Sequence, residues 1–365
     1  MNQPLNLEDY EQLARERLPV MVYDYYAGGA GDEQTLHENV KAWSHLRIRP
    51  RVLVDVGERD LSISVLGQTV AMPLLLAPCA FNTLAHPEGE RAVTRAAAAV
   101  GIIQVVSTAS TIRLEDVAAV GQGLRWFQLY CYRDRGITRQ LVERAEATGY
   151  SALCVTVDMS IAGQRERDAR NRFALPEGTR WANLEDVGLG RMPPLSEGSA
   201  LAKYFADLLD PSITWELIGW LREITSLPIV VKGILTHEDA SLAVEHGVDG
   251  IIVSNHGGRQ LDGVPPTCEV LPEVVDAADR KVEVLVDGGI RRGHDIFKAL
   301  ALGARAVLIG RPYLWGLAVD GEAGVKRVLD LLREELSLTM GLAGRPTVAS
   351  IDRSAVKALD DALRS

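Results

Sequence analysis

Residues 251–262 read Ile-Ile-Val-Ser-Asn-His-Gly-Gly-Arg-Gln-Leu-Asp. The first three residues form an apolar run that is typical of a buried strand, and Gly257 and Gly258 then open a turn in which the backbone can approach a ligand closely. This turn brings His256 and Arg259 to the end of the strand. An imidazole can move a proton near neutral pH, and a guanidinium is a fixed cationic fork that fits a carboxylate. Two interpretations stay open at this point: a site that holds an organic acid and removes a proton beside it, or a capped strand end with a surface arginine.

The same pattern, a short apolar run followed by a helical segment, occurs eight times in the chain. The runs begin at residues 73, 102, 125, 152, 228, 250, 283 and 306. The helical segments between them include residues 88–100, 139–148, 215–224, 237–246 and 295–302. Each run is continuous rather than alternating, as expected for a parallel sheet covered by helices. Eight such units predict an α/β protein with a closed (β/α)8 TIM barrel. The competing fold, an open nucleotide-binding sheet, is disfavoured because no G-x-G-x-x-G follows the first run.

We predict one domain over residues 1–365. Its parts are an N-terminal extension (1–72), the barrel (73–345) with a long insertion after the fourth strand (159–211), and a C-terminal tail (346–365). The extension is expected to be helical as far as Tyr26 and to hold short strand-like pieces at 51–54 and 61–65. Long insertions in compact domains are commonly lids or binding loops, so we expect residues 159–211 to form a lid.

Composition excludes several classes of protein. The net charge of −10 and the absence of a basic stripe argue against a nucleic-acid surface. The four cysteines are scattered without a C-x-x-C pair, and the histidines outside position 256 lack ligand spacing, which predicts a reducing compartment and no metal site. No apolar run approaches 18 residues, the first residues are polar, and the last three are not a peroxisomal address. We therefore expect a soluble, cytoplasmic protein.

Polar side chains follow directly on several of the predicted strands. Asp158, Lys232 and His256 end strands four, five and six, and their burial without partners would be costly. Because the strands of a barrel end at one rim, Asp158 could orient the imidazole of His256, although a structural ion pair is the alternative. Lys232 has three interpretations: a Schiff-base nucleophile, a structural ion pair, or a positive charge beside a cofactor that becomes anionic.

The last two strand ends indicate phosphate binding. Asp287-Gly288-Gly289-Ile290-Arg291 follows strand seven, and Gly310-Arg311 follows strand eight. Barrels commonly bind phosphate at these two loops, where bare backbone N–H groups and arginines meet. Ordinary turns with exposed arginines are the alternative.

With these residues assembled, the chain resembles the FMN-dependent 2-hydroxy acid oxidase and dehydrogenase family, which includes glycolate oxidase, lactate oxidase and mandelate dehydrogenase. The resemblance covers essentially the whole chain, and its most specific motif is the run Ser254-Asn255-His256-Gly257-Gly258-Arg259-Gln260-Leu261-Asp262. Its other motifs are Tyr23-Asp24-Tyr25-Tyr26-Ala27-Gly28-Gly29, Ala85-His86-Pro87-Glu88-Gly89-Glu90, Phe127-Gln128-Leu129-Tyr130, Thr156-Val157-Asp158, Val231-Lys232-Gly233, Asp287-Gly288-Gly289-Ile290-Arg291-Arg292-Gly293 and Ile309-Gly310-Arg311-Pro312.

The resemblance implies a role for each matching residue. His256 takes a proton from the substrate, Asp158 stabilises its charged form, Tyr130 contacts the substrate hydroxyl, and Lys232 stabilises the reduced, anionic flavin. The substrate carboxylate is held by Tyr25, Arg165 and Arg259. The residues implied to bind FMN are Pro78, Cys79, Ala80, Ser107, Gln128, Thr156, Lys232, Ser254, Asp287, Gly289, Arg291, Gly310 and Arg311.

Three departures from plant glycolate oxidases bear on the substrate. Ala109 stands where those enzymes have tryptophan, as it does in lactate oxidases, so a substrate larger than glycolate should fit. Cys79 replaces threonine, and Gln164 replaces an arginine of the lid. We therefore expect an (S)-2-hydroxy acid oxidase that favours L-lactate.

The electron acceptor follows from the insertion. Membrane-bound dehydrogenases of this family carry an apolar anchor there, whereas residues 180–211 carry charges throughout. This favours oxygen as acceptor, with hydrogen peroxide as product, in a homo-oligomer such as the tetramers or octamers of the relatives. The alternatives are a 2-hydroxy acid dehydrogenase of the lactate, glycolate or mandelate type with another acceptor, and a barrel lyase that uses Lys232 as a Schiff base.

Overall fold

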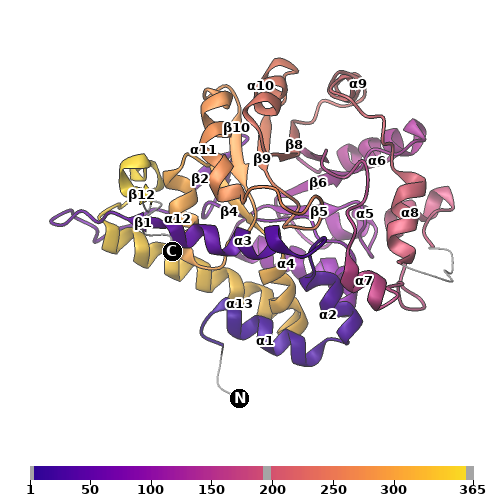
Figure 1. Cartoon of the computed structure of the whole chain (residues 1–365), viewed down its shortest axis with the longest axis horizontal. Helices are drawn as coiled ribbons and strands as arrows, with labels where there is room; N and C mark the ends of the chain where they lie inside the picture. Colours follow the sequence, from indigo (N-terminus) through magenta and orange to yellow (C-terminus); the bar gives the residue numbers. More distant parts are fainter. Residues whose placement is uncertain (1–3, 192–198, 359–365) are drawn as a thin grey trace.

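A closed barrel of eight parallel strands forms the centre of the structure (Figure 1), a computed structural model that describes residues 4–191 and 199–358. The strands follow one another around the barrel in chain order, and β11 pairs with β4 to close it. They are β4 (Leu74–Leu76), β5 (Gln104–Ser107), β6 (Arg125–Leu129), β7 (Leu153–Thr156), β8 (Ile229–Ile234), β9 (Gly250–Val253), β10 (Glu283–Val286) and β11 (Ala306–Ile309). All eight fall in the predicted runs, and the predicted (β/α)8 barrel is confirmed.

Helices cover the outside of the barrel and return the chain from each strand to the next (Figure 1). They are α4 (Gly89–Val100), α5 (Leu114–Ala118), α6 (Arg135–Ala147), α9 (Glu216–Ile224), α10 (His237–Glu245), α11 (Thr267–Ala278), α12 (Gly293–Ala301) and α13 (Arg311–Ala343). The last is bent where Asp320 and Gly321 leave helical geometry. With both faces of the sheet covered, the strands can be apolar along their whole length.

The barrel interior is filled by alternate strand residues, among them Leu75, Val105 and Ile252. A hairpin of β2 (Ile63–Val65) and β3 (Gln68–Val70) packs against the same cluster. Its Gln68 accepts a hydrogen bond from the indole of Trp126 near the start of β6. The hairpin therefore closes the amino-terminal end of the barrel, which leaves the carboxyl ends of the strands for a site.

The remaining elements lie around this core. The N-terminal extension holds α1 (Leu7–Arg17), α2 (Val20–Ala27), α3 (Gln34–Ala42), η1 (Trp43–His45) and β1 (Leu46–Ile48), and η2 (Asn82–Leu84) follows the first barrel strand. The insertion holds α7 (Glu166–Arg170), η3 (Ala182–Val187) and α8 (Ala200–Leu208), and the tail holds η4 (Val348–Ser350), η5 (Arg353–Ala355) and β12 (Val356–Ala358). β12 pairs antiparallel with β1, so the C-terminal tail lies against the last strand of the N-terminal extension. Within residues 4–191 and 199–358, no helix is long and apolar enough to cross a bilayer.

The strand-like piece expected at residues 51–54 is wrong. These residues form an irregular loop in which Leu53 has a φ of 60° and both Val52 and Leu53 are exposed. Without a neighbouring strand or a buried face, β-branched residues do not form a strand by themselves. The piece expected at 61–65 contains β2, and residues 192–198 of the predicted insertion lie outside the described residues.

One barrel strand is irregular. The register of β8 against β9 shifts between Lys232 and Ile234, and Gly233 has a φ of 120°. A Cβ atom on Gly233 would lie 2.6 Å from the Cβ of Asp158. The bulge therefore needs glycine, because its missing side chain is the space that Asp158 occupies.

Candidate active site

A cavity lies at the carboxyl ends of the strands. Most of the residues predicted from the strand ends line it: Tyr25, Pro78, Cys79, Ala80, Ser107, Gln128, Tyr130, Thr156, Arg165, Lys232, His256, Arg259, Asp287, Gly289, Arg291, Gly310 and Arg311. They come from all eight strand ends, from α2 and from the insertion. The barrel therefore brings segments that are distant in sequence to one site.

His256 and Asp158 form a direct pair on this rim. The imidazole Nδ1 lies 2.9 Å from the Asp158 Oδ1 atom, and both side chains are largely buried. Burial lowers the pKa of His256 below its usual 6.5, although Asp158 acts in the opposite direction. Burial alone would raise the pKa of Asp158, but its interactions with His256, helped by the charge of Lys232, outweigh burial and lower the pKa. A neutral imidazole whose second nitrogen is free of Asp158 can accept a proton.

The backbone at His256 is left-handed, with a φ of 57°, and Gly257 and Gly258 continue in the same region. Such a conformation is uncommon for a residue with a side chain and persists only where its surroundings impose it. Here the His256 N–H donates to the Ser254 hydroxyl at 3.1 Å. The turn thus directs the imidazole to the cavity instead of along the strand.

Lys232 is a buried ammonium with two partners. Its Nζ lies 3.1 Å from the Asp287 Oδ2 atom and donates to Ser254 Oγ at 2.7 Å. Burial alone would lower the pKa of Lys232, but the carboxylates of Asp287 and Asp158 outweigh it and raise the pKa. The side chain therefore stays protonated. A Schiff-base nucleophile needs a neutral amine, so this environment disfavours the lyase interpretation.

Two arginines and a tyrosine gather at the other side of the cavity. The Arg259 guanidinium donates to the carbonyls of Tyr25 and Gly28 at 2.7 and 2.8 Å and lies 5.1 Å from the Tyr25 ring centre. Arg165 donates to the Arg259 carbonyl at 3.4 Å. Burial and the nearby Arg259 charge lower the pKa of Arg165 to about 10. Among the described residues neither arginine forms an ion pair, although the charge of the buried Asp168 acts on Arg165. Two cations that face one cavity are suited to bind an anion.

Glycines and arginines also meet at the ends of β10 and β11, as predicted. A Cβ atom on Gly289, which has a φ of 77°, would lie 1.9 Å from the carbonyl oxygen of Asn39 on α3. Arg311 donates to the backbone carbonyls of Tyr26, Gly28 and Gly257. Burial, followed by the charge of Arg259, lowers the pKa of Arg311 to about 9. This end of the cavity is crowded with backbone and positive charge.

Three predicted residues lie just behind the lining. Asp158 contacts His256, and Ser254 contacts Lys232, so both act on residues that line the cavity. Ala109 is 1% exposed, and its carbonyl accepts from the Phe81 N–H at 3.0 Å. Its methyl group does not line the cavity, where Met159 and Phe205 of the insertion do.

Sequence reasoning missed Met159, Phe205 and the α3 residues Leu36, Asn39 and Val40, all of which line the cavity. The two insertion residues have no strand pattern around them that could have placed them. The structure explains the place of α3: Asn39 is buried, and its amide exchanges two 2.9 Å hydrogen bonds with Asn255 of the 251–262 stretch.

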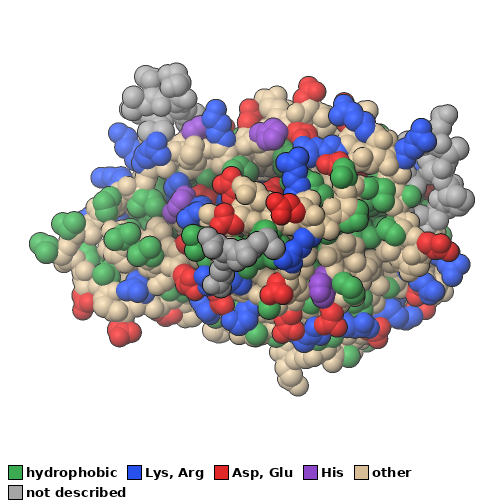
Figure 2. Space-filling view, turned by 90° about the horizontal axis from the view of Figure 1, so that it is seen from below, with side chains coloured by type: hydrophobic (Ala, Val, Ile, Leu, Met, Phe, Trp, Pro, Cys, Tyr) green, Lys and Arg blue, Asp and Glu red, His purple; other side chains and the backbone are tan. Residues whose placement is uncertain are grey.

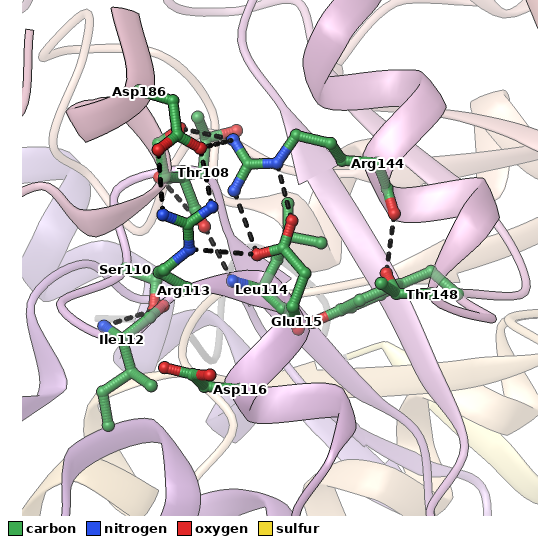
Figure 3. Close-up of polar contacts among 12 residues, drawn as sticks. Thr108, Ser110, Ile112, Arg113, Leu114, Glu115, Asp116, Arg144, Thr148 and Asp186 are labelled. Atoms are coloured by element: carbon green, nitrogen blue, oxygen red, sulfur yellow. Dashed lines mark hydrogen bonds and ion pairs between the residues drawn. The ribbon is translucent and has the colours of Figure 1, made fainter. Parts of the chain in front are cut away.

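The insertion is fastened to the barrel by a cluster of charges around Arg113 and Arg144 (Figure 3). Arg113 forms a two-pronged pair with Asp186 of η3 at 2.9 and 2.6 Å, and Arg144 forms one with Glu115 at 2.7 and 3.0 Å. Beneath them, Asn183 accepts from the Leu114 N–H at 2.8 Å and donates to the Thr108 carbonyl at 3.0 Å. This joins η3 to the loop after β5.

Comparison with known proteins agrees with this geometry. Residues 14–358 match the model of the FMN-dependent dehydrogenase family. The chain belongs to this family. It is 54% identical to an L-lactate oxidase of Nostoc sp. over 97% of this chain and 98% of the relative. It is 51% identical to a glycolate oxidase of Spinacia oleracea over 97% and 95%. A crystal structure of mandelate oxidase with (S)-4-hydroxymandelic acid superposes with a TM-score of 0.93 at 46% identity, covering 97% of this chain and 99% of that one.

The cofactor of the FMN-dependent dehydrogenase family is FMN, and the residues of this cavity fit it. Ser107, Gln128 and Thr156 form a hydrogen-bonded row across β5, β6 and β7. Lys232 and Asp287 continue it, and Asp287 Oδ1 is buried without a hydrogen-bond partner among the described residues. Cationic Arg291 and Arg311 lie at the phosphate end. Polar groups for a flavin ring and charges for a phosphate are thus both present.

Proposed function

We propose that the protein is an FMN-dependent (S)-2-hydroxy acid oxidase that favours L-lactate and reduces oxygen to hydrogen peroxide. The observation that carries the proposal is the His256–Asp158 pair, which shares one cavity with Arg165 and Arg259. A proton acceptor beside an anion clamp matches a substrate with a hydroxyl next to a carboxylate.

In the proposed reaction each cavity side chain has its own role. Arg165 and Arg259 bind the carboxylate, and Tyr130 donates a hydrogen bond to the substrate oxygen, since burial raises the pKa of its phenol and keeps it protonated. His256 accepts a proton from the substrate, and Asp158 stabilises the imidazolium. FMN, when bound, supplies the two-electron acceptor. Lys232, which lines the cavity, would supply positive charge to the reduced cofactor. The net products would be a 2-oxo acid and, from oxygen, hydrogen peroxide.

Substrate size is proposed to depend on the insertion. Phe205 packs against Tyr130 with ring centres 5.7 Å apart and against Trp181 at 5.1 Å, and it lines the cavity together with Met159. This wall suits a methyl group better than a phenyl group. Phe205→Ala should raise activity on mandelate relative to lactate, and Ala109→Trp should shift preference towards glycolate. An unchanged substrate profile in both variants would mean that other residues set the limit.

Anaerobic reduction of the bound flavin by a panel of 2-hydroxy acids, followed by admission of oxygen, tests the function. We expect lactate to bleach the flavin fastest and oxygen to restore the colour with release of peroxide. Fast bleaching with negligible reoxidation would favour a dehydrogenase that uses another acceptor. Borohydride should leave Lys232 unmodified in the presence of substrate.

We also propose a homo-oligomer. Figure 2 shows hydrophobic side chains gathered at the end of the molecule that carries the loop after β1 and the C-terminal part of α13. Val52 and Leu53 of that loop are exposed, as are Leu338 and Leu342 of α13. Exposed apolar side chains in such numbers are typical of an interaction surface. Light scattering after gel filtration measures the mass, and a monomer would contradict this proposal.

A cytoplasmic location stays a prediction.

A further inference from the structure

Gln260 joins the two segments that carry the proton acceptor and the anion clamp. Its Nε2 donates to the carbonyl of Asp158 at 2.7 Å and to the carbonyl of Ile161 at 2.8 Å. Its Oε1 accepts from the Gly163 N–H at 3.0 Å. The contacts go to Asp158 at the end of the fourth barrel strand and to the start of the insertion that follows it, whereas Gln260 itself belongs to the loop after β9.

The two segments lie in direct contact at this point. A Cβ atom on Gly163 would lie 2.6 Å from the Arg259 carbonyl oxygen and 2.7 Å from the Gln260 Cα. Glycine is therefore required for the insertion to approach so closely. On one side of the contact lie Asp158 and Arg165, and on the other lie His256 and Arg259.

We propose that Gln260 is a positioning residue that fixes Asp158 against His256 and sets the spacing of Arg165 and Arg259. The inference rests on the proposed function for its kinetic consequences. Gln260 itself does not line the cavity, so it acts through the four residues that it aligns. Its amide suits this task, because it offers two donors for two carbonyls and one acceptor for one N–H.

Gln260→Met is the sharpest test because it keeps the length of the side chain and removes its hydrogen bonds without adding a charge. Leu261→Ala is the matched control, since Leu261 is 71% exposed in the same loop. Misplacement of reacting groups by fractions of an ångström is costly, so we expect kcat/KM on lactate to fall about tenfold or more, with KM rising and kcat falling. Flavin content and Tm should match the control.

A second readout separates positioning from stability and does not need turnover. The titration of His256, followed by NMR of ¹³C-labelled histidine, reports its distance from Asp158, which raises the pKa, and from Lys232 and Arg165, which lower it. Gln260→Met should move this titration, and Leu261→Ala should not. The proposal would be overturned if the kinetics and the titration were both unchanged. It would also be overturned if the variant lost Tm and flavin but kept normal kinetics per bound flavin. If the wild-type protein oxidises no hydroxy acid but the titration still moves, the function fails and the positioning role stands.

Discussion

The cavity at the barrel mouth and the charge cluster of Figure 3 are both built from arginines and carboxylates, but they balance charge differently. In the cluster, Arg113 meets Asp186 and Arg144 meets Glu115. Hydrogen bonds from Arg113 lower the pKa of Asp186, and those from Arg144 outweigh burial to lower the pKa of Glu115. Each ion there already has its counterion.

In the cavity the balance is incomplete. Burial, followed by the charge of Arg259, lowers the pKa of Arg165 to about 10 and that of Arg311 to about 9. Asp158 Oδ2 and Asp287 Oδ1 are buried and have no hydrogen-bond partner among residues 4–191 and 199–358. Each carboxylate is paired through its other oxygen, with His256 and with Lys232, but a buried polar atom that lacks a hydrogen bond is costly. The comparison teaches that clustered cations and unsatisfied carboxylate oxygens mark the proposed ligand site, whereas fully matched pairs mark an anchor.

His256→Ala should have the largest effect. Loss of the proton acceptor is expected to slow flavin reduction about 10²–10⁴-fold, the usual contribution of a general base. FMN should stay bound, because the residues at the phosphate end are unchanged. Stopped-flow reduction and the absorbance spectrum measure both. Retained reduction with loss of flavin would contradict the role assigned to His256.

Arg165→Met comes next and tests the unbalanced charge directly. Removal of one half of the anion clamp should raise KM for lactate about 10- to 100-fold, since one charged hydrogen bond to the carboxylate is lost. Steady-state kinetics check this. Because the variant also removes a buried, poorly compensated cation, its Tm should not fall; a large drop would indicate that Arg165 has a structural partner.

The pH dependence gives a smaller, signed effect. A protonated imidazole cannot accept a proton, so kcat/KM should fall as the pH drops through the pKa of His256, which burial places below 6.5. Activity should therefore persist to lower pH than with an unshifted histidine. Asp158→Asn removes the charge that raises this pKa, so the acid limb should move further down while the plateau drops. A limb that moves up would contradict the pairing.

The anchor should show the smallest effects on catalysis. Asp186→Asn removes a partly exposed ion pair and should cost at most about 1 kcal/mol of stability, less at high salt, with kcat unchanged. Asn183→Ala removes buried hydrogen bonds and should cost about 1–3 kcal/mol. Urea unfolding of both variants compares them. A larger loss in Asp186→Asn than in Asn183→Ala would mean that the ion pairs, and not Asn183, hold η3.

The barrel and much of its cavity could be predicted from sequence, because the strands of a parallel barrel appear in the sequence as continuous apolar runs. The ends of those runs placed Asp158, Lys232 and His256 on one rim, and the structure brings them together. Phe205 and Met159 could not be placed, because the insertion has no repeat that fixes its path. Ala109 illustrates the same limit: its small size is visible in the sequence, but whether space beside it stays empty depends on packing by distant residues. The loop at 51–54 shows that β propensity without a partner strand does not make a strand.

The bulge at Gly233 has a consequence for redesign. With any other residue at position 233 of this backbone, a Cβ atom would lie 2.6 Å from the Cβ and 2.8 Å from the Cγ of Asp158. A designer who copied only the histidine, the aspartate and the arginines onto a barrel without this glycine bulge would find the aspartate displaced. The transferable unit is the irregular strand together with its side chains, since one extra residue in the backbone creates the vacancy into which the acid fits.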